Sequence, residues 1–354
     1  MTQQNVNKTE TNKRKGERTM TQENKQVIQI SSIKELQKIG NDPAYPLDGE
    51  YELTRDIDAS DTINWKKGKG FKPIKSFTGK FYGKGYKIVN LYINRSDRDD
   101  VGLFGRLYGE IRDLGIENAM VTGSNQVGGL VGANYGGTLS NCYSTGTING
   151  DNHVGGLVGS NQGTMTICYS MGSVSGKDRV GGLVGYNKGT LNDCYSTGSV
   201  IGNNKESGGL IGRNEGTVSG CYSTGPVIEN NNVDGLAEVN CKNTITNSCS
   251  TSSTNGNICT AGRLIGYNYR GMITNSYSKN KESEDQSTTK FVNCNVKSTI
   301  NSHSTNSEKK CIRIPIPAID ASGCSAILFL LIFPVIGIIW SILTLFQDIA
   351  TKIQ

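Results

Sequence analysis

The apolar positions of the chain repeat with a period of about 27 residues. Leucine recurs seven times, each time followed by a second small or apolar residue, and successive leucine numbers differ by 27, 27, 26, 27, 26 and 28. The leucines are Leu103, Leu130, Leu157, Leu183, Leu210, Leu236 and Leu264. A fixed period of this length is typical of solenoids, in which stacked units bury a core that no single unit can bury alone.

Each unit holds short β-type runs, such as GGLVG, TLSNCYS and TGTI, which glycine and asparagine separate. No run is long enough for an amphipathic helix, the spacing of leucine-rich repeats is absent, and a propeller blade needs about 40 residues. Three short strands and three turns fit one coil of a parallel β-helix, in which equivalent residues stack about 4.8 Å apart. The sequence therefore predicts an all-β, right-handed parallel β-helix with coils of about 26–27 residues.

Further columns of identical residues have a physical meaning in this fold. The leucines point inward, and glycine supplies positive-φ corners and close backbone approaches. We expect the asparagine four residues after each leucine at a left-handed turn and in a hydrogen-bonded amide column. These residues are Asn134, Asn161, Asn187, Asn214, Asn240 and Asn268.

A cysteine column precedes a tyrosine column in four successive units, at Cys142, Cys168, Cys194 and Cys221. The chain has ten cysteines but no C-x-x-C pair, so a zinc ribbon is not expected. Stacked rungs place neighbouring cysteines within the Cα range of a disulfide. Free cysteine is also a good small core residue, and we favour buried thiols over disulfides.

The segment before the repeats, residues 27–100, reads as a cap and lead-in coils of the same solenoid. In SSIKELQKIG (31–40), Ile33, Leu36 and Ile39 have helical spacing after a serine cap. This predicts a short helix that closes the exposed end of the stack. The repeats themselves span 101–305, with a polar insertion near 279–290.

The two ends of the chain differ from the middle. Residues 1–26 are polar and basic and lack the apolar stretch of a secretory signal, which predicts a disordered tail. Residues 326–346 form an uncharged apolar run, and its length of about 20 residues predicts a single membrane-spanning helix. A linker (306–325) precedes this helix and a short polar tail (347–354) follows it. Lys309, Lys310 and Arg313 before the helix favour a cytoplasmic solenoid.

Composition supports a folded, glycine-rich protein. Glycine supplies 45 of 354 residues, and with glycine counted as apolar the apolar share is close to that of folded proteins. A disordered chain is therefore excluded. Glycine does not recur at every third position and the chain has 7 prolines, which excludes collagen.

The strongest charge anomaly lies in residues 62–96, which hold nine basic residues and no acidic one, although the net charge of the chain is only +6. Aromatic residues interleave the lysines, so the segment is a candidate binding site for an anionic polymer. The alternative is a strand with aromatic residues inside and lysines outside. We expect acidic glycan or membrane phosphate as the ligand, and not nucleic acid. The candidate residues are Lys66, Lys67, Lys69, Lys72, Lys80, Lys84 and Lys87; Lys75 and Arg95 complete the run.

Acidic residues recur in the turn before the GLVG strand, at Asp99, Asp100, Asp151, Asp178, Glu206 and Asp234. Asp151 and Asp178 on neighbouring rungs could form the carboxylate pair of a retaining glycosidase or hold a hard cation. Because these positions are not in strict register, we favour a solvated turn. The two histidines, His153 and His303, lie outside any H-E-x-x-H motif, and we expect structural roles for both. The sequence predicts no catalytic residue, metal or cofactor.

The units VGGLVGANYGGTLSNCYSTGTI, VGGLVGSNQGTMTICYSMGSV and VGGLVGYNKGTLNDCYSTGSV resemble the GLUG repeat. The resemblance covers residues 28–305 and is strong for four units. It implies a β-helical surface or adhesion module outside the cell, and no catalysis by the repeats.

We therefore expect a non-enzymatic, membrane-anchored β-solenoid that binds glycan or protein. Two alternatives remain open. One is a polysaccharide lyase or glycoside hydrolase on a β-helix. The other is a cytoplasm-facing, tail-anchored scaffold, which the flanking charges and the missing signal favour.

Overall fold

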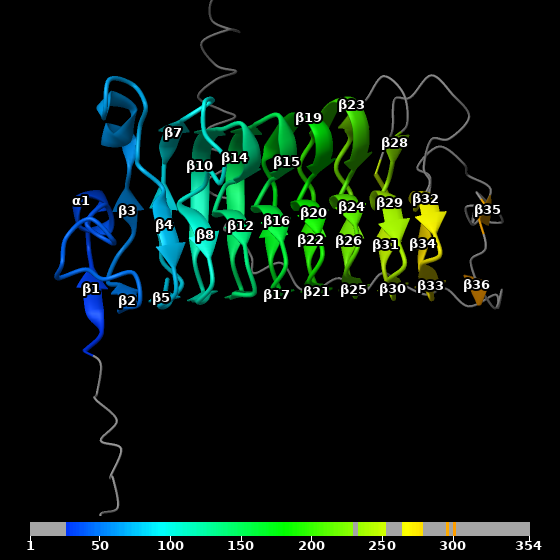
Figure 1. The fold of residues 1–354 in the computed structure, drawn as a ribbon, viewed down its shortest axis with the longest axis horizontal. Helices are drawn as coiled ribbons and strands as arrows, with labels where there is room; N and C mark the ends of the chain where they lie inside the picture. The colour runs from blue at the N-terminus through cyan, green and yellow to red at the C-terminus, as the bar shows by residue number, and fades with distance from the viewer. Residues whose placement is uncertain (1–25, 229–232, 253–263, 279–294, 297–299, 302–354) are drawn as a thin grey trace, which may run out of the picture. The chain divides into compact units, whose positions relative to one another are not determined.

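The computed structural model describes residues 26–228, 233–252, 264–278, 295–296 and 300–301. Within the compact unit formed by residues 1–300, short strands follow one another as coils that stack side by side (Figure 1). Strands of successive coils pair in parallel and form three long sheets, here called sheets A, B and C.

Sheet A runs along the lower edge of the solenoid in Figure 1 and has eleven strands. They are β1 (Ile28–Ile30), β2 (Glu50–Leu53), β5 (Lys80–Tyr82), β9 (Glu110–Arg112), β13 (Thr138–Ser140), β17 (Thr164–Thr166), β21 (Thr190–Asn192), β25 (Thr217–Ser219), β30 (Thr244–Thr246), β33 (Met272–Thr274) and β36 (Ile300–Asn301). Sheet C has nine. They are β4 (Ile74–Phe77), β8 (Phe104–Leu107), β12 (Val131–Asn134), β16 (Val158–Asn161), β20 (Val184–Asn187), β24 (Ile211–Asn214), β29 (Ala237–Cys241), β32 (Ile265–Tyr269) and β35 (Asn295–Val296).

Sheet B has sixteen strands of different lengths. Some coils contribute two short strands to this sheet, and others contribute one long strand. They are β3 (Ile57–Asp58), β6 (Lys87–Val89), β7 (Tyr92–Asn94), β10 (Gly115–Thr122), β11 (Asn125–Gly128), β14 (Tyr143–Asn149), β15 (Asn152–Gly155), β18 (Tyr169–Ser170), β19 (Ser173–Gly181), β22 (Tyr195–Ser196), β23 (Val200–Gly208), β26 (Tyr222–Ser223), β27 (Val227–Ile228), β28 (Val233–Asp234), β31 (Cys249–Ser250) and β34 (Tyr277–Ser278).

One coil visits the three sheets in the order C, A, B and then enters the next coil. β12, β13, β14 and β15 form such a coil, and β16 begins the next one directly beside β12. The in-register partners are one repeat apart, as in Val131 beside Val158 and Tyr143 beside Tyr169. The prediction of an all-β fold is confirmed: the chain forms a right-handed parallel β-solenoid of about nine coils, and its lead-in strands β1 to β7 belong to the same three sheets.

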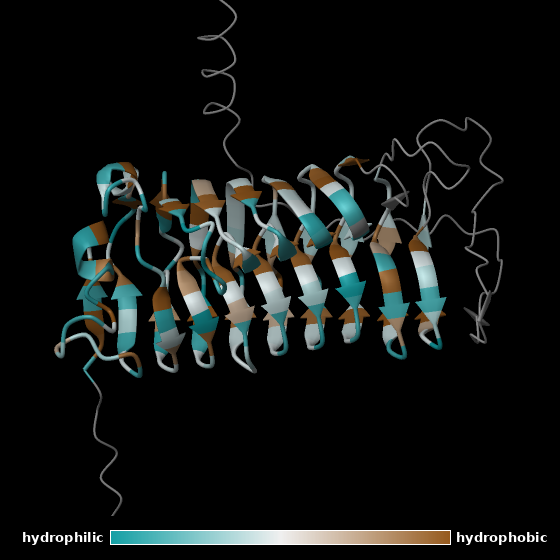
Figure 2. Cartoon of the chain, turned by 45° about the horizontal axis from the view of Figure 1, so that its top comes forward, coloured by the Kyte–Doolittle hydropathy of each residue, from teal (hydrophilic) through white to brown (hydrophobic). Residues whose placement is uncertain are grey.

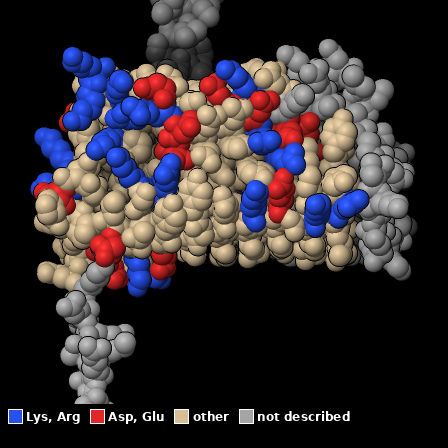
Figure 3. All heavy atoms as spheres, in the orientation of Figure 1, with Lys and Arg blue, Asp and Glu red and all other residues tan. Residues whose placement is uncertain are grey.

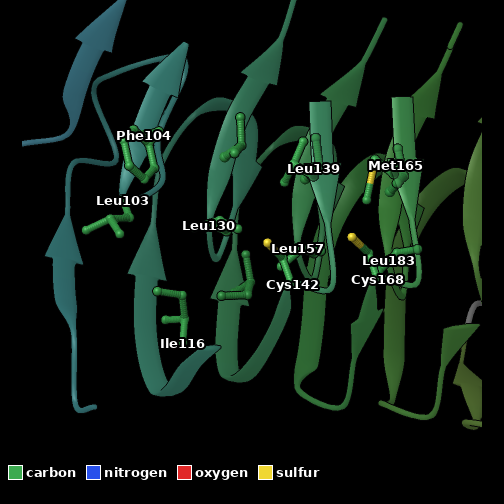
Figure 4. Close-up of a cluster of buried hydrophobic side chains, with 14 of the residues drawn as sticks. Leu103, Phe104, Ile116, Leu130, Leu139, Cys142, Leu157, Met165, Cys168 and Leu183 are labelled. Atoms are coloured by element: carbon green, nitrogen blue, oxygen red, sulfur yellow. The ribbon is translucent and has the colours of Figure 1, made fainter. Parts of the chain in front are cut away.

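The leucine column builds the core, as predicted. Leu103, Leu130, Leu157 and Leu183 point into the solenoid one behind the other and are fully buried (Figure 4). Hydrophobic and hydrophilic positions alternate along the strands around this core (Figure 2). Burial of continuous apolar columns is the main stabilising contribution in such a fold, because each coil covers the apolar surface of its neighbour.

The glycine pairs of the GGLVG runs serve close packing between sheets rather than corners of positive φ. The φ values above +20° fall mainly on other residues, for example Asn141, Ile167 and Asp193 at the corner between sheets A and B. A Cβ at Gly182 would overlap the carbonyl oxygen of Gly209 and the hydroxyl of Ser196. The predicted close approach is therefore confirmed for these pairs, and positive φ occurs at other glycines, such as Gly136 and Gly220 at corners between sheets.

The asparagine column forms an amide ladder, as predicted. Each side-chain Nδ2 donates to the Oδ1 of the next asparagine at 2.8 or 2.9 Å, from Asn134 through to Asn268. The expected left-handed turn at these residues is wrong, since none of the six has a positive φ and each lies in a strand of sheet C. The amides instead bind the following turn directly: Asn187 accepts from the backbone N–H of Gly189 at 3.2 Å.

The described residues contain one α-helical turn, α1 (Ile33–Leu36), whose N-cap is Ser32. A 3₁₀-helix, η1 (Ser60–Asn64), follows β3. Ile33, Leu36 and Ile39 are buried in the core cluster. The helical turn is shorter than the segment 31–40, and its role in closing the stack stays a prediction.

Several predicted segments lie outside the described residues. They are residues 1–25 of the basic tail, the polar insertion from 279 to 290, the linker (306–325), the apolar run (326–346), the tail (347–354) and His303. In the part of the chain that the structure describes, no helix combines the length and the apolar character needed to cross a membrane.

Candidate interaction surfaces

The basic run divides into two groups in the fold. The first group, here called the basic turn, is Lys66, Lys67 and Lys69 in the turn that follows η1. Lys66 and Lys67 have φ values of 51° and 58°, and Gly68 and Gly70 continue the left-handed turn. All three lysines are exposed. Trp65 stacks on Phe71 with ring centroids 6.4 Å apart and fixes the base of this turn against the core.

The second group, here called the strand lysines, is Lys80 in β5, Lys87 in β6 and Lys84 in the turn between these two strands. Each forms an ion pair with a glutamate of a neighbouring strand: Lys80 with Glu50 at 4.0 Å, Lys84 with Glu52 at 3.5 Å, and Lys87 with Glu117 at 3.0 Å. Lys72 donates to the side chain of Asn41 at 2.6 Å. These partners come from other coils, so the local sequence does not show that the positive charges of the strand lysines are compensated.

Lys66 and Lys67 have no ion-pair partner among the described residues, and Lys69 reaches only the exposed Asp97 at 3.9 Å. Lys and Arg side chains gather over the N-terminal coils in Figure 3, whereas the lower part of the visible face is largely uncharged. The interleaved aromatic residues Phe71, Phe77 and Phe81 are fully buried. Phe71, Phe77 and Phe81 thus lie inside and the lysines outside, although Tyr86 of the same run is 38% exposed. Lys72 and Lys75 also lack an ion-pair partner among the described residues, but only Lys66 and Lys67 are adjacent to each other in one exposed turn.

The acidic turns do not form a registered carboxylate pair. Asp178 lies beside Asn152 in the pairing of β15 with β19, and the carboxylate of Asp151 binds Lys177 at 2.7 Å. Asp99 accepts from the backbone and side chain of Asn125 at 3.1 and 2.8 Å. The expectation that these positions are out of strict register is confirmed. No group of three or more His, Cys, Asp or Glu residues in the described ranges could hold a metal ion.

His153 belongs to a polar cluster on the outside of the solenoid. Its Nε2 lies 2.6 Å from a terminal nitrogen of Arg179, and its ring stacks on Tyr186 with centroids 5.1 Å apart. Since guanidinium can only donate, Nε2 must accept, and His153 is neutral. Burial, together with the charge of Arg179, lowers the pKa of His153 to about 4. Arg179 in turn binds Glu206 at 2.8 Å, which gives His153 a structural role.

The four cysteines of the column are free and buried, as predicted. Each thiol donates to the backbone carbonyl two residues earlier, for example Cys194 to Asn192 at 3.1 Å and Cys142 to Ser140 at 3.3 Å. Burial raises the pKa of the Cys142 and Cys194 thiols, which keeps them protonated. Cys142 and Cys194 are therefore core residues rather than reactive thiols.

The tyrosine column forms a ladder on the outside of sheet B. Tyr143, Tyr169, Tyr195 and Tyr222 stack with centroids 4.7 to 4.9 Å apart and interplanar angles of 2° to 3°. The hydroxyl of Tyr143 donates to Glu117 at 2.8 Å. Because each ring covers the face of the next, the inner rings offer no free face on which a sugar could stack.

Sheet A carries a surface that the sequence reasoning did not single out. The outward positions of β13, β17, β21, β25 and β30 form two rows, here called the hydroxyl face: Thr138, Thr164, Thr190, Thr217 and Thr244, and Ser140, Thr166, Asn192, Ser219 and Thr246. The inward positions between them, such as Leu139 and Leu191, are fully buried. In the sequence, this face is indicated by the T-x-S/T/N pattern that recurs in successive units.

Comparison with known proteins identifies the repeats. The family model of the GLUG motif matches residues 123–149, 178–201 and 203–229. Halomucin from Haloquadratum walsbyi is 44% identical over 124 residues, which is 32% of this chain and 1% of halomucin. A protein of Evansella cellulosilytica, provisionally named a Gly-rich membrane protein, is 35% identical over 95 residues, which is 24% of this chain and 11% of that protein. The chain thus spans a small part of both relatives.

The fold also resembles a crystal structure from Bacteroides ovatus that is provisionally assigned as an immunoglobulin A1 protease. The TM-score is 0.52 at 19% sequence identity, over 70% of this chain and 84% of that one. This likeness shows a shared β-solenoid fold.

Proposed function

Because the chain carries GLUG-motif repeats that form a parallel β-solenoid, we propose that it is a non-enzymatic interaction module held at the cell surface by a membrane anchor. The uncharged run from 326 to 346 supplies the anchor. The similarity to halomucin and to a protein named for the membrane supports display at the surface. A rigid solenoid with regular outer faces suits adhesion to glycan or protein.

The observation that carries the proposal is the contrast between the two lysine groups. The strand lysines are ion-paired, whereas Lys66 and Lys67 in the basic turn have no ion-pair partner among the described residues. An exposed cluster of uncompensated positive charge attracts anions and raises their rate of association. The basic turn therefore binds an anionic group, the sulfate or carboxylate of an acidic glycan or the phosphate of a lipid.

The test compares two triple variants of the full chain that remove the same charge. K66A/K67A/K69A should weaken binding to a sulfated glycan at least tenfold, and K80A/K84A/K87A should weaken it less than threefold. Binding of heparin measured between low and physiological salt should decrease with ionic strength, because the contact is electrostatic. Vesicles with and without anionic lipid distinguish lipid phosphate from glycan as the source of the anion.

Equal loss of binding in the two triple variants would contradict the assignment to the basic turn. Absence of binding to heparin and to anionic vesicles would contradict an anionic ligand altogether. Duplex DNA serves as a competitor, and stronger binding to DNA than to heparin would reassign the turn to nucleic acid.

A carbohydrate-active enzyme would need Asp151 and Asp178 as a carboxylate pair. The ion pair of Asp151 with Lys177 and the position of Asp178 beside Asn152 do not favour that arrangement. Incubation of the wild-type chain with a broad panel of polysaccharides tests this directly. We expect no cleavage, and cleavage that D151A/D178A abolishes would establish the enzyme.

A further inference from the structure

The hydroxyl face of sheet A has a chemistry different from that of the basic turn. Nine of its ten positions carry a hydroxyl group and the tenth carries an amide, so the face has no charge over five successive coils. All ten side chains are exposed or half-buried. At the spacing of parallel strands, the two rows run roughly 20 Å along the solenoid.

The hydroxyl groups of this face and its one amide group have no hydrogen-bond partner among the described residues. Inside the solenoid, Ser144 donates to the carbonyl of Gly156 at 2.5 Å and Ser223 to that of Gly235 at 2.6 Å, whereas the buried hydroxyl groups of Ser170 and Ser196 have no hydrogen-bond partner among the described residues. Hydroxyl groups that can both donate and accept suit a partner rich in hydroxyl groups.

The borders of the face restrict the charge of that partner. The corner between sheets A and B carries Asp113, Asn141, Asp193 and Asn247, each with a positive φ between 48° and 53°. The carboxylates of Asp113 and Asp193 supply acceptors and repel a polyanion, and the amides of Asn141 and Asn247 are uncharged. On the opposite border, Tyr108 stacks on Tyr135 with centroids 5.5 Å apart, and Tyr108 is 46% exposed. This exposed aromatic pair offers an apolar surface at one end of the rows.

We propose that the hydroxyl face binds a neutral, extended polysaccharide that lies along the solenoid axis. The proposal deepens the proposed adhesive function, on which it rests, by naming the ligand class of one solenoid face. Single threonine contacts are weak, but a periodic polymer engages successive coils at once, and linked contacts multiply the affinity. The uncharged rows admit a neutral chain without the cost of burying an unpaired charge.

The experiment measures depletion of the purified full chain by insoluble cellulose, chitin and β-1,3-glucan. T190K/T217K places two long charged side chains in the middle of one row and should weaken binding at least tenfold. T190V/T217V keeps the shape and removes two hydroxyl groups, and we expect a loss of three- to tenfold. T147K/S173K makes the same change at neighbouring outward positions of sheet B and should leave binding unchanged.

The variant K66A/K67A/K69A should retain binding to the neutral polysaccharide. The experiment therefore distinguishes whether the proposal for the basic turn or the proposal for the hydroxyl face is wrong. Binding to none of the three polysaccharides would overturn the proposal, as would equal binding by T190K/T217K. One further outcome would overturn it: the wild-type chain binds no polysaccharide but lowers the freezing point of its solution, and T190K/T217K does not lower it. The hydroxyl face would then bind ordered water.

Discussion

At the scale of single residues, the buried polar side chains determine how accurately the coils register. Asn187 illustrates this: it accepts from Asn161 at 2.9 Å, donates to Asn214 at 2.8 Å and also binds the turn at Gly189. These three amides are fully buried, and each is satisfied only if the neighbouring coil is in register. The ladder therefore specifies alignment, whereas the leucines supply most of the apolar burial.

Replacement of Asn187 by alanine should destabilise the chain by about 2–4 kcal/mol, because buried amide groups of Asn161 and Asn214 lose their partners. Asn192→Ala is the matched control, since Asn192 is a half-buried outward residue of sheet A, and it should cost less than about 0.5 kcal/mol. Urea unfolding followed by circular dichroism measures both. Equal effects of the two substitutions would contradict the structural role of the ladder.

His153 should make stability depend on pH. Its pKa is about 4 in the fold and 6.5 in the unfolded chain, so between these values the unfolded chain binds more protons. Stability is therefore complete above pH 6.5 and decreases as the pH falls to 4, by roughly 1–2 kcal/mol after allowance for partial exposure. The charged and titratable groups around the ring are Arg179, Glu206, Asp178, Lys188 and Tyr186.

Thermal unfolding of the wild type and of H153Q, measured at steps between pH 7 and pH 4, tests this dependence. The wild type should lose more stability than H153Q over this range. Parallel curves for the two proteins would show that carboxylates, and not His153, cause the decrease.

At the scale of strands and sheets, two tyrosines of the same ladder should respond differently to loss of the hydroxyl. Tyr143 donates to Glu117, whereas the hydroxyl of Tyr195 is buried without a hydrogen-bond partner among the described residues. Tyr143→Phe should cost about 0.5–1.5 kcal/mol, and Tyr195→Phe should be neutral or stabilising. Denaturant unfolding of both variants decides this, and a larger loss for Tyr195→Phe would contradict the described contacts.

The repeating columns made the strands and the core predictable from the sequence, because every coil repeats the same alternation. Leu157 could be assigned an inside position from its period alone. For Asn161 the period predicted the amide column, but it did not predict that the residue lies in a strand of sheet C instead of at a left-handed turn. The compensation of Lys80 by Glu50 and of Lys87 by Glu117 could not be predicted, because it depends on which residues neighbouring coils bring together. The same holds for Gly182, which is small because Ser196 faces it across the interior.

The hydroxyl face is a set of repeating positions whose importance is not visible from the sequence alone. Threonine at 138, 164, 190, 217 and 244 is a column as regular as the leucines, but threonine is also a common strand residue. Its significance became visible only when the structure showed that sheet A is exposed and that its hydroxyl groups have no partner among the described residues.

At the scale of the whole molecule, the stack should tolerate the loss of one complete coil. Deletion of residues 158–183 joins Leu157 to Val184. Val184 occupies the position in its coil that Val158 occupies in the preceding coil, so the register of the later coils is kept. The shortened chain should fold with less stability and a smaller denaturant dependence, because one coil and one interface are removed. Deletion of residues 158–170, half of the same coil, is the control and should abolish folding, since every later strand changes sheet. Circular dichroism and urea unfolding compare the two.

The central claim is that the solenoid is displayed outside the cell as a binding surface. The most direct test is an epitope tag at residue 1 and a protease added to intact cells, followed by immunoblotting with and without permeabilisation. The account predicts that the epitope is lost from intact cells, while a cytoplasmic marker protein remains. Protection of the epitope until the cells are permeabilised would contradict the adhesive function and would support the cytoplasm-facing scaffold.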